Sequence, residues 1–354
     1  MKKIILTGGG TAGHVMPNIG LLPYLSDYEI HYVGSVNGIE RSLLEKYPQV
    51  KYHAIRTGKF RRSFTFKNVT DVFNVIGGYK DAKKIMKEVN PDVIFSKGGF
   101  VSVPPVLAAR KRKIPIITHE SDLTPGLANK IISRYATKVL TTFPETVPMI
   151  KGGKGEFIGS PVRENLFDGD KARGLSFLAF EDESKPVLTI MGGSLGSVFL
   201  NNAVRNNLAA LTERFNIVHM CGRGHLDNSI SDPSYRQFEF ISAELSDVLA
   251  ATSVMLSRAG SNAINEFAAL DIPMLLIPLS KKASRGDQIL NADSFAARNY
   301  AVVLYEEDYN DAAFMAKIDE VITRYDEIKK SLAAFDERDG IKKIYNEIER
   351  SLEK

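Results

Sequence analysis

Glycine-rich turns flanked by polar residues are the parts of this sequence that could carry chemistry. The first is Gly8-Gly9-Gly10-Thr11-Ala12-Gly13-His14, whose glycines 8, 10 and 13 fit the pattern G-x-G-x-x-G directly after a short apolar run. Glycines let a backbone approach a ligand closely, and the helix that follows offers free N–H groups to an anion. The turn therefore predicts a phosphate-binding site.

His14 follows the last glycine of this turn and is a candidate catalytic base. We expect it at a helix N-terminus, where the helix dipole disfavours the protonated imidazole and keeps the ring neutral. A neutral imidazole can take the proton of a hydroxyl nucleophile. The alternative is a histidine that only hydrogen-bonds an acceptor phosphate or its own loop.

Two further segments of the first half place polar residues directly after apolar runs: Ser96-Lys97-Gly98-Gly99 and His119-Glu120-Ser121-Asp122. In open parallel sheets, ligands bind at the carboxyl ends of the strands, where both segments are expected to lie. An ordinary connection between a strand and a helix explains any one of these segments. It explains poorly why these two segments and the first glycine turn all have this character.

The second half repeats the arrangement. Met191–Ser197 is a glycine-rich turn, in which Ser194 and backbone N–H groups could hold a diphosphate without a metal. Small residues, Ala259-Gly260-Ser261, open a later helix, and Glu266 one to two turns further could accept both hydroxyls of a ribose. Asp287-Gln288 could supply amide contacts to a sugar. The alternatives are a solvated helix face for Glu266 and a capped helix start for Asp287-Gln288.

Short apolar runs rich in β-branched residues alternate with helical patterns, which is typical of parallel sheets covered on both faces. The pattern occurs twice, and each half opens with a strand that leads into a glycine-rich turn. The expected strands are 3–7, 30–33, 52–55, 93–96, 114–119, 138–141 and 156–158, then 187–191, 217–220, 237–240, 254–257, 274–277 and 301–304. We therefore predict an α/β protein with two doubly wound domains.

The two domains are expected to join near Gly159–Arg163, ahead of a loop over Asp168–Lys185. This gives one domain over residues 1–160 and a second over 161–340. The tail carries apolar residues at helical spacing, so residues of about 341–354 should form an amphipathic helix that packs back on the first domain.

Composition limits the class of protein. The chain has 354 residues with 44% apolar and 25% charged residues, which suits a globular protein of two domains. The single cysteine, Cys221, excludes an internal disulfide framework and a cysteine-built zinc site. Asp168-Gly169-Asp170 formally fits the metal-binding pattern D-x-D, but it does not follow a buried strand, and the histidines lack ligand spacing. We expect no metal, no cofactor and, without a long apolar run, a cytosolic location.

A basic window between Gly58 and Lys87 holds most of the net charge of +4. Its apolar residues are interleaved with cations, and Arg110–Lys113 could extend it. Such a patch suits an anionic bilayer surface, where each cation contributes on the order of 1 kcal/mol. Nucleic acid is the rival partner, but no recognised binding module supports it; a core helix with a solvated basic face is the third reading. The basic residues of the window are Lys59, Arg61, Arg62, Lys67, Lys80, Lys83, Lys84 and Lys87.

The first turn also raises a nicotinamide-dependent oxidoreductase as an alternative. That class expects an acid at the end of the second strand to hold the ribose. The expected strand ends at Tyr32-Val33-Gly34-Ser35, and the next acid is Glu40. A dinucleotide cofactor is therefore disfavoured.

Taken in order from Gly8 to Ala292, the segments GGGTAGHVMPNIG, SKGGFVSVP, HESD-LTPGLANK, GSPVR, GGSLGS, SRAGSNAINE and DQILNA resemble the MurG family of peptidoglycan glycosyltransferases. The resemblance implies transfer of N-acetylglucosamine from UDP-N-acetylglucosamine to undecaprenyl-diphosphate-linked N-acetylmuramoyl-pentapeptide, with inversion and without a metal. It also implies two Rossmann-like domains facing a cleft (the GT-B fold) and a peripheral membrane protein on the cytoplasmic side. A transferase for another lipid acceptor, such as diacylglycerol, and a non-enzymatic nucleotide-sugar sensor are the alternatives.

The resemblance also implies roles for individual residues. Arg163 and Ile241 would meet the uracil through backbone groups, Ser194 the diphosphate and Glu266 the ribose. The full donor set is Thr11, Ala12, Gly13, Arg163, Ser194, Ile241, Ala259, Gly260, Ser261, Glu266 and Gln288. The acceptor set is Gly10, His14, Gly98, Gly99 and Glu120. The sequence departs from many relatives at Ala12, where they have glycine, at Phe100, where some have tyrosine, and at Asp122, where HESD replaces HEQN.

Overall fold

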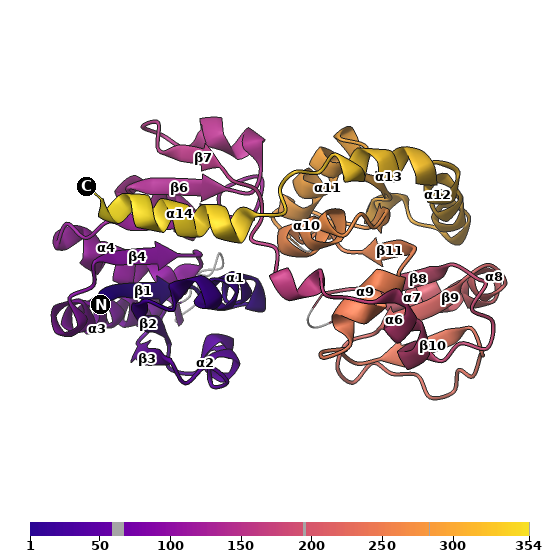
Figure 1. Ribbon diagram of the computed structural model, residues 1–354, viewed down its shortest axis with the longest axis horizontal. Helices are drawn as coiled ribbons and strands as arrows, with labels where there is room; N and C mark the ends of the chain where they lie inside the picture. The colour runs from indigo at the N-terminus through magenta and orange to yellow at the C-terminus, as the bar shows by residue number, and fades with distance from the viewer. Residues whose placement is uncertain (59–66, 194–195, 283, 354) are drawn as a thin grey trace. The chain divides into compact units, whose positions relative to one another are not determined.

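The structure is a computed structural model that describes residues 1–58, 67–193, 196–282 and 284–353. Contacts within the chain divide it into two units (Figure 1). The first unit consists of Met1–Pro161 and Asp339–Lys354, and the second of Val162–Arg338. Each unit is built on a parallel β-sheet, which confirms the predicted α/β class with two doubly wound sheets.

Among the described residues, the first sheet has seven strands in the order β3-β2-β1-β4-β5-β6-β7. They are β1 (Lys2–Thr7), β2 (Tyr28–Ser35), β3 (Val50–Ile55), β4 (Val93–Ser96), β5 (Ile116–Glu120), β6 (Lys138–Thr141) and β7 (Gly155–Phe157). The order of connection reverses between β1 and β4. Such a reversal is the switch point at which open α/β sheets bind ligands, and a glycine turn follows each of these two strands.

The second sheet has the same design, with the order β10-β9-β8-β11-β12-β13 and its switch point between β8 and β11. Its strands are β8 (Val187–Met191), β9 (Asn216–Met220), β10 (Tyr235–Phe238), β11 (Val254–Ser257), β12 (Met274–Leu276) and β13 (Ala301–Val303). Every strand expected from the sequence is present, with ends shifted by two residues or fewer.

Helices cover both faces of each sheet. In the first unit they are α1 (Met16–Gly20), α2 (Ile39–Leu44), α3 (Lys67–Val89), α4 (Val103–Lys111), α5 (Leu127–Tyr135) and α14 (Gly340–Leu352). In the second they are α6 (Lys171–Leu178), α7 (Val198–Asn206), α8 (Leu208–Thr212), α9 (Leu245–Ala251), α10 (Ser261–Ala269), α11 (Asp287–Ala297), α12 (Asp311–Thr323) and α13 (Tyr325–Ala333). Because side chains alternate along a strand, Ile4 and Leu6 enter one core of the first unit and Ile5 enters the other.

The C-terminal helix α14 packs on one face of the first sheet, next to β4 (Figure 1). Its isoleucines share one face of the helix and are buried in the same core as Ile4 and Leu6. They are Ile341, Ile344 and Ile348. At the far end of the helix, Glu349 accepts hydrogen bonds from Tyr28 and from Lys2 (2.6 Å). The helix is therefore an integral part of the first unit.

The expected loop over Asp168–Lys185 is wrong, because α6 occupies its middle. The Asp170 carboxylate caps this helix by accepting a hydrogen bond from the backbone N–H of Arg173 (2.8 Å). Gly174 lets the helix lie against α9, since a Cβ there would come within 2.2 Å of the carbonyl oxygen of Asp247. Because glycine is a weak helix former, Gly174 inside the segment made the sequence pattern indicate a loop where α6 forms.

Two glycines in the interior of α3, Gly77 and Gly78, are explained by a contact with Arg56. A Cβ at Gly78 would lie 2.0 Å from the carbonyl oxygen of Arg56, and one at Gly77 would lie 2.9 Å from its guanidinium carbon. Interior glycine costs a helix about 1 kcal/mol relative to alanine. In return, the segment after β3 lies directly on the helix, where the Arg56 guanidinium binds Asp81 through two hydrogen bonds of 2.8 and 2.7 Å.

We expect Gly78→Ala to lower the free energy of unfolding by about 1–3 kcal/mol, because the new methyl group meets a backbone carbonyl. The same substitution in an uncrowded helix raises stability by about 1 kcal/mol. Urea denaturation measures the difference. Lys80→Ala, at an exposed position of the same helix, is the control and should change stability by less than about 0.5 kcal/mol. A Gly78→Ala protein at least as stable as the wild type would contradict the packing described above.

Candidate functional site

The first glycine turn lies directly after β1, and close contacts fix its shape. A Cβ at Gly8 would lie 2.3 Å from the carbonyl oxygen of His14. Gly10 has a φ of +85°, and a Cβ there would lie 2.7 Å from the ring of Phe100. Glycine alone fits both positions, so the backbone of the turn can be approached closely, as the sequence predicts.

Glu40 supports this turn from within the protein. It is fully buried, and its carboxylate accepts hydrogen bonds from the backbone N–H groups of Ser35 (2.8 Å) and Gly10 (3.3 Å). Glu40 therefore lies near the end of the second strand, where a dinucleotide-binding protein holds its ribose. Both carboxylate oxygens are already used by the chain, which argues against that role. Sequence reasoning missed this support because Glu40 follows the strand end by several residues.

His14 is the last residue of a short 3₁₀ helix, Ala12–His14, and α1 begins two residues later at Met16. The expected position at a helix N-terminus is therefore only partly correct, because the ring lies between two short helices. The His14 ring does lie beside the second glycine turn, since a Cβ at Gly99 would be 3.0 Å from its Cδ2 atom and 3.5 Å from its Nε2 atom.

The second glycine turn touches the first. Gly98 and Gly99 have φ angles of +90° and +79°, which favour glycine. A Cβ at Gly99 would lie 2.7 Å from the carbonyl oxygen of Gly9, and one at Gly98 would lie 2.3 Å from the Asn129 side chain. The structure thus brings together the glycine residues, 10, 98 and 99, that the sequence assigns to an acceptor. Thr11 precedes the 3₁₀ helix that ends at His14, and Ala12 and Gly13 are the first two residues of that helix.

Lys97 is a buried residue of this site that sequence reasoning did not single out. It directly follows β4 and is 1% exposed. Its side-chain nitrogen lies 2.7 Å from His119 Nδ1 and contacts the Ser121 hydroxyl. His119 Nε2 in turn lies 3.2 Å from the carbonyl oxygen of Gly159. The chain of contacts joins the ends of β4 and β5 to the segment that leads out of the unit. A lysine beside glycines gave no signal in the sequence that it would be buried.

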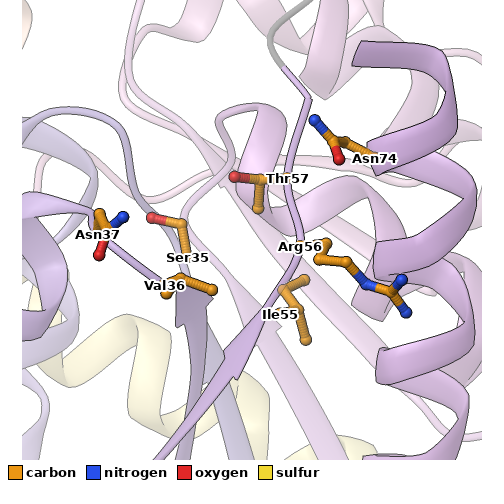
Figure 2. A pocket seen from close by; sticks show the side chains of 7 residues that line it. All are labelled: Ser35, Val36, Asn37, Ile55, Arg56, Thr57 and Asn74. Atoms are coloured by element: carbon orange, nitrogen blue, oxygen red, sulfur yellow. The ribbon is translucent and has the colours of Figure 1, made fainter. Parts of the chain in front are cut away.

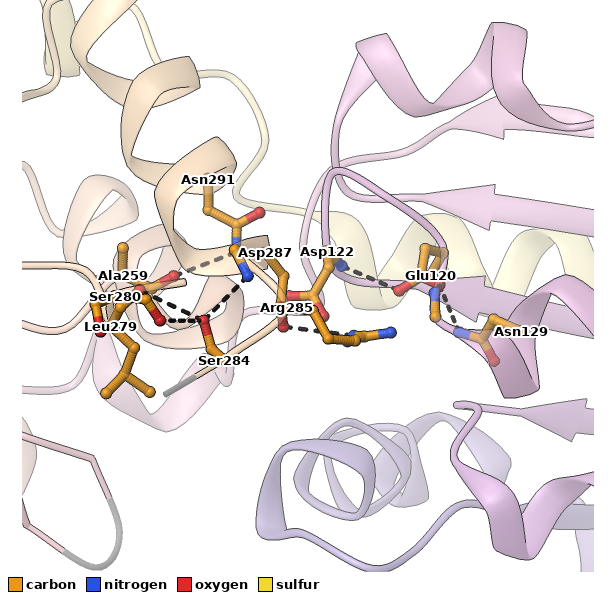
Figure 3. Close-up of polar contacts among 12 residues, drawn as sticks. Glu120, Asp122, Asn129, Ala259, Leu279, Ser280, Ser284, Arg285, Asp287 and Asn291 are labelled. Atoms are coloured by element: carbon orange, nitrogen blue, oxygen red, sulfur yellow. Dashed lines mark hydrogen bonds and ion pairs between the residues drawn. The ribbon is translucent and has the colours of Figure 1, made fainter. Parts of the chain in front are cut away.

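Glu120 ends β5 and is held by three N–H donors (Figure 3). Asn129 Nδ2 donates to it at 2.8 Å, and the backbone N–H groups of Asp122 and Gly126 donate at 3.1 Å each. Burial raises the pKa of Glu120 to about 7 and lowers the pKa of Lys97 to about 7. The acceptor candidate Glu120 is therefore positioned firmly, and its protonation can change near neutral pH.

In the second unit, the turn after β8 contains Ser194, which lies outside the described residues. Gly196 has a φ of +76°, and a Cβ there would come within 2.1 Å of the carbonyl oxygen of Cys221. Ser197 caps α7, and its hydroxyl accepts a hydrogen bond from Arg258 Nε (3.1 Å). Arg258 is buried and also pairs with Glu306 (2.7 Å). Arg258 therefore connects the turn after β8 to the loop after β11. This role depends on residues that are neighbours only in space, so the sequence pattern does not predict it.

The loop after β11 opens α10 as the sequence predicts. Ser261 is the first residue of the helix, and no described atom lies within 4 Å of the place where a Gly260 Cβ would be. The carbonyl oxygen of Ala259 accepts a hydrogen bond from Asn291 Nδ2 at 3.2 Å (Figure 3). A helix N-terminus with open space in front of it suits an anion such as a diphosphate.

Glu266 and Arg163 form an ion pair with two hydrogen bonds, of 2.8 Å from Nε and 3.1 Å from Nη2. Their side chains are 13% and 23% exposed, so the pair is mostly shielded from water. The sequence assigns Glu266 to a ribose and Arg163 to a uracil, and the structure shows that the two residues are neighbours. A ribose at Glu266 would share the carboxylate with Arg163.

Two further donor candidates, Gln288 and Ile241, lie in the same unit. Gln288 is in the first turn of α11, and its Oε1 accepts a hydrogen bond from the backbone N–H of Leu279 (3.0 Å), which directs the amide. Ile241 follows β10 and is 2% exposed. Within the described part of the chain, no cluster of three or more His, Cys, Asp or Glu side chains could hold a metal ion.

The buried amine of Lys97 should make stability depend on pH. Its pKa falls from the ordinary 10.5 to about 7, so between these values the unfolded chain binds more protons and stability rises with pH. Lys97→Met removes this contribution. We expect the unfolding free energy of the wild type minus that of the variant to increase by up to ~3 kcal/mol between about pH 7.5 and about pH 9.5. Urea titrations measure it. Lys87→Met, at an exposed site, should show no such trend; a flat difference for Lys97→Met would refute the assignment.

Comparison with known proteins adds the family. The model of the Glycosyltransferase family 28 N-terminal domain matches residues 4–141, and that of the C-terminal domain matches residues 187–347. The chain is 48% identical to a Clostridium novyi protein over 98% of both chains, and 49% identical to a Bacillus cereus protein over 98% of this chain and 99% of the relative. Both are named UDP-N-acetylglucosamine–N-acetylmuramyl-(pentapeptide) pyrophosphoryl-undecaprenol N-acetylglucosamine transferase, with the suffix 2 in Bacillus cereus.

Solved structures share the fold. The crystal structure of Acinetobacter baumannii MurG aligns with a TM-score of 0.80 at 21% identity, over 99% of this chain and 100% of that one. A UDP-GlcNAc 2-epimerase from Neisseria meningitidis, bound to UDP-GlcNAc, aligns with a TM-score of 0.68 at 13% identity over 99% of both chains. The domain matches and the extent of the identity lead to one conclusion: the chain belongs to glycosyltransferase family 28 and, within it, to the family of these N-acetylglucosamine transferases.

Proposed function

We propose that this chain transfers N-acetylglucosamine from UDP-N-acetylglucosamine to the C4 hydroxyl of an undecaprenyl-diphosphate-linked N-acetylmuramoyl-pentapeptide. The observation that carries the proposal is the 48–49% identity, over nearly the full length, to relatives named for this reaction. The site supports it, because each unit offers loops suited to a diphosphate at the switch point of its sheet. The product is the lipid-linked disaccharide from which peptidoglycan of the cell wall is made.

The donor UDP-N-acetylglucosamine binds, in this proposal, to the second unit. The N-terminus of α10 and the turn after β8, including Ser194, meet the diphosphate. Glu266, oriented by its pair with Arg163, accepts hydrogen bonds from the ribose. Gln288 has its Oε1 engaged by Leu279 and offers its Nε2 group to the sugar. Ile241 contributes a backbone contact to the uracil.

The acceptor binds to the first unit. Backbone N–H groups of the two touching glycine turns meet its diphosphate, because these turns let an anion approach closely. The N–H groups of Gly10 and Gly98 are not among them, since they donate to Glu40 and Ser96. Glu120 is fixed by three N–H donors and can accept a hydrogen bond from the acceptor sugar. His14 lies beside Gly99 and takes the role of base.

The reaction is a single displacement. The acceptor oxygen forms a bond to the anomeric carbon while the bond from that carbon to the UDP oxygen breaks on the opposite side, which inverts the configuration to β. His14 takes the hydroxyl proton. The charge that develops on the departing UDP is stabilised by N–H groups at the α10 N-terminus, which are oriented before the reaction begins. In this mechanism no metal ion takes part.

The first unit is also proposed to rest on the cytoplasmic surface of an anionic membrane. Exposed cations gather on two helices that pack together, α3 and α4. A cavity of about 1010 Å³ lies at the end of α4; Arg110, Lys111 and Lys113 line it there, and its lining also includes Glu156, Glu347 and Glu353. No helix among the described residues is long and apolar enough to cross a membrane. The exposed cations are Lys80, Lys83, Lys84, Lys87 and Arg110–Lys113; the side chains of Lys59, Arg61, Arg62 and Lys67 lie outside the described set. We propose no nucleic acid partner.

One assay tests the function as a whole. The pure protein is incubated in EDTA with UDP-N-acetylglucosamine and a short-chain lipid-linked muramoyl-pentapeptide, and UDP release is followed. We expect release that requires both substrates and persists in the chelator. Release with diacylglycerol instead would favour the related transferase, and loss of transfer in EDTA would contradict the metal-free mechanism. Binding of the UDP-sugar without turnover would overturn the proposal in favour of a sensor.

His14→Ala should lower kcat by about 10²–10⁴-fold, the usual contribution of a general base. His14→Gln keeps a hydrogen-bonding group without the basicity and should be equally slow. If His14 only binds the acceptor phosphate, the KM for the acceptor rises and kcat is retained, which would remove it as the base. His225→Ala, in the second unit, is the matched control and should leave both constants unchanged.

A further inference from the structure

A cavity of about 320 Å³ opens at the carboxyl ends of β2 and β3, on the same edge of the first sheet as the first glycine turn (Figure 2). The residues assigned above to the donor or the acceptor do not line it. Pockets that bind small molecules usually span about 300–1,000 Å³, so this one suits a part of a ligand. Its described lining consists of Ser35, Val36, Asn37, Ile55, Arg56, Thr57 and Asn74.

The two walls of the cavity are fixed by specific contacts. On the β2 side, Glu40 binds the backbone N–H and the hydroxyl of Ser35 (2.8 and 2.5 Å) with one carboxylate oxygen and Gly10 N–H with the other. This carboxylate therefore connects the cavity wall to the glycine turn. On the β3 side, the Arg56–Asp81 pair and the glycines of α3 hold the Arg56-Thr57 segment against the helix.

Four of the seven lining residues are polar and uncharged: Ser35, Asn37, Thr57 and Asn74. Arg56 is the one charged residue among the seven, and it is already paired: its guanidinium lowers the pKa of Asp81. Figure 2 shows Asn37 on one side of the cavity and Thr57 and Asn74 on the other. The structure records no hydrogen bond between these three side chains and another described residue. A carboxamide offers both donors and an acceptor, which is the complement of another amide.

We propose that this cavity is a subsite for amide groups of the acceptor. The inference rests on the proposed function, whose acceptor carries amides in its N-acetyl and lactoyl groups and along its stem peptide. The cavity is placed to bind them because Glu40 joins its wall to the turn that meets the acceptor diphosphate. Asn37 and Asn74 bind the amides directly, and Arg56 is a positioning residue that acts through the Thr57 segment.

The experiment uses the full-length protein and a set of variants. Asn37→Ala and Asn74→Ala remove the carboxamides, and Thr57→Val removes a hydroxyl while keeping the shape of the side chain. Asn228→Ala, an exposed asparagine of the second unit, is the matched control. Each protein is assayed with three short-chain lipid-linked acceptors: the muramoyl-pentapeptide, the muramoyl-monopeptide and peptide-free N-acetylmuramic acid. Circular dichroism and the melting temperature confirm that each variant is folded.

We expect each cavity variant to raise the KM for the pentapeptide acceptor by about three- to ten-fold, the effect of one lost neutral hydrogen bond. The KM for UDP-N-acetylglucosamine and the value of kcat should stay unchanged, a split that general destabilisation of the fold would not produce. If the stem peptide occupies the cavity, the effect disappears with the peptide-free acceptor. If the N-acetyl amide of the sugar occupies it, all three acceptors are affected alike; the lactoyl amide exists only when a peptide is attached and therefore behaves like the stem peptide in this comparison. Both outcomes support the subsite and identify the source.

An unchanged acceptor KM in all three folded variants, or a raised KM for the donor instead, would overturn the subsite. This failure differs from a failure of the proposed function. In that case the wild-type protein would release no UDP with any of the three acceptors. If the wild-type protein transfers the sugar but the cavity variants behave like Asn228→Ala, only the subsite is refuted and the proposed function stands.

Discussion

The carbonyl oxygen of Gly9 lies so close to Gly99 that no side chain fits between them, and the acceptor site proposed above depends on this approach. It joins the turns after β1 and β4, the two strands that flank the switch point. The turns thus meet through backbone atoms at the carboxyl edge of the sheet. His14, Phe100 and Asn129 pack around the same glycines, so the side chains of the site take their positions from this contact.

Charged groups near the glycine turns and loops are held by partners within the protein. Glu40 and Glu120 are bound by backbone N–H groups, Glu266 by Arg163, and Arg258 by Glu306. Fixed dipoles and paired charges stabilise a developing charge without having to reorient, which is the form of catalysis that a departing diphosphate needs. The site thus combines an open backbone for anions with side chains that do not move to meet them.

Much of the architecture could be predicted from the sequence, because strands of parallel sheets and glycine turns are encoded locally. All the strands and the residues of the glycine turns were found in this way. The roles of Glu40, Lys97 and Arg258 could not be predicted, since each depends on neighbours that are distant along the chain. The helix α6 was hidden by Gly174, whose small size serves a contact with α9. The prediction that His14 lies at a helix N-terminus is only partly correct, because the residue ends one short helix and precedes another.

The chain passes from the first unit to the second after Pro161 and returns after Arg338 to add α14. This has a consequence for synthesis on the ribosome. Residues 162–338 form a continuous unit that can fold as soon as it emerges. The first unit is made earlier but lacks the isoleucines that cover Ile4 and Leu6 until the final helix is released. One apolar face of its sheet stays uncovered until then. The first unit is therefore completed after the second, although it is translated first.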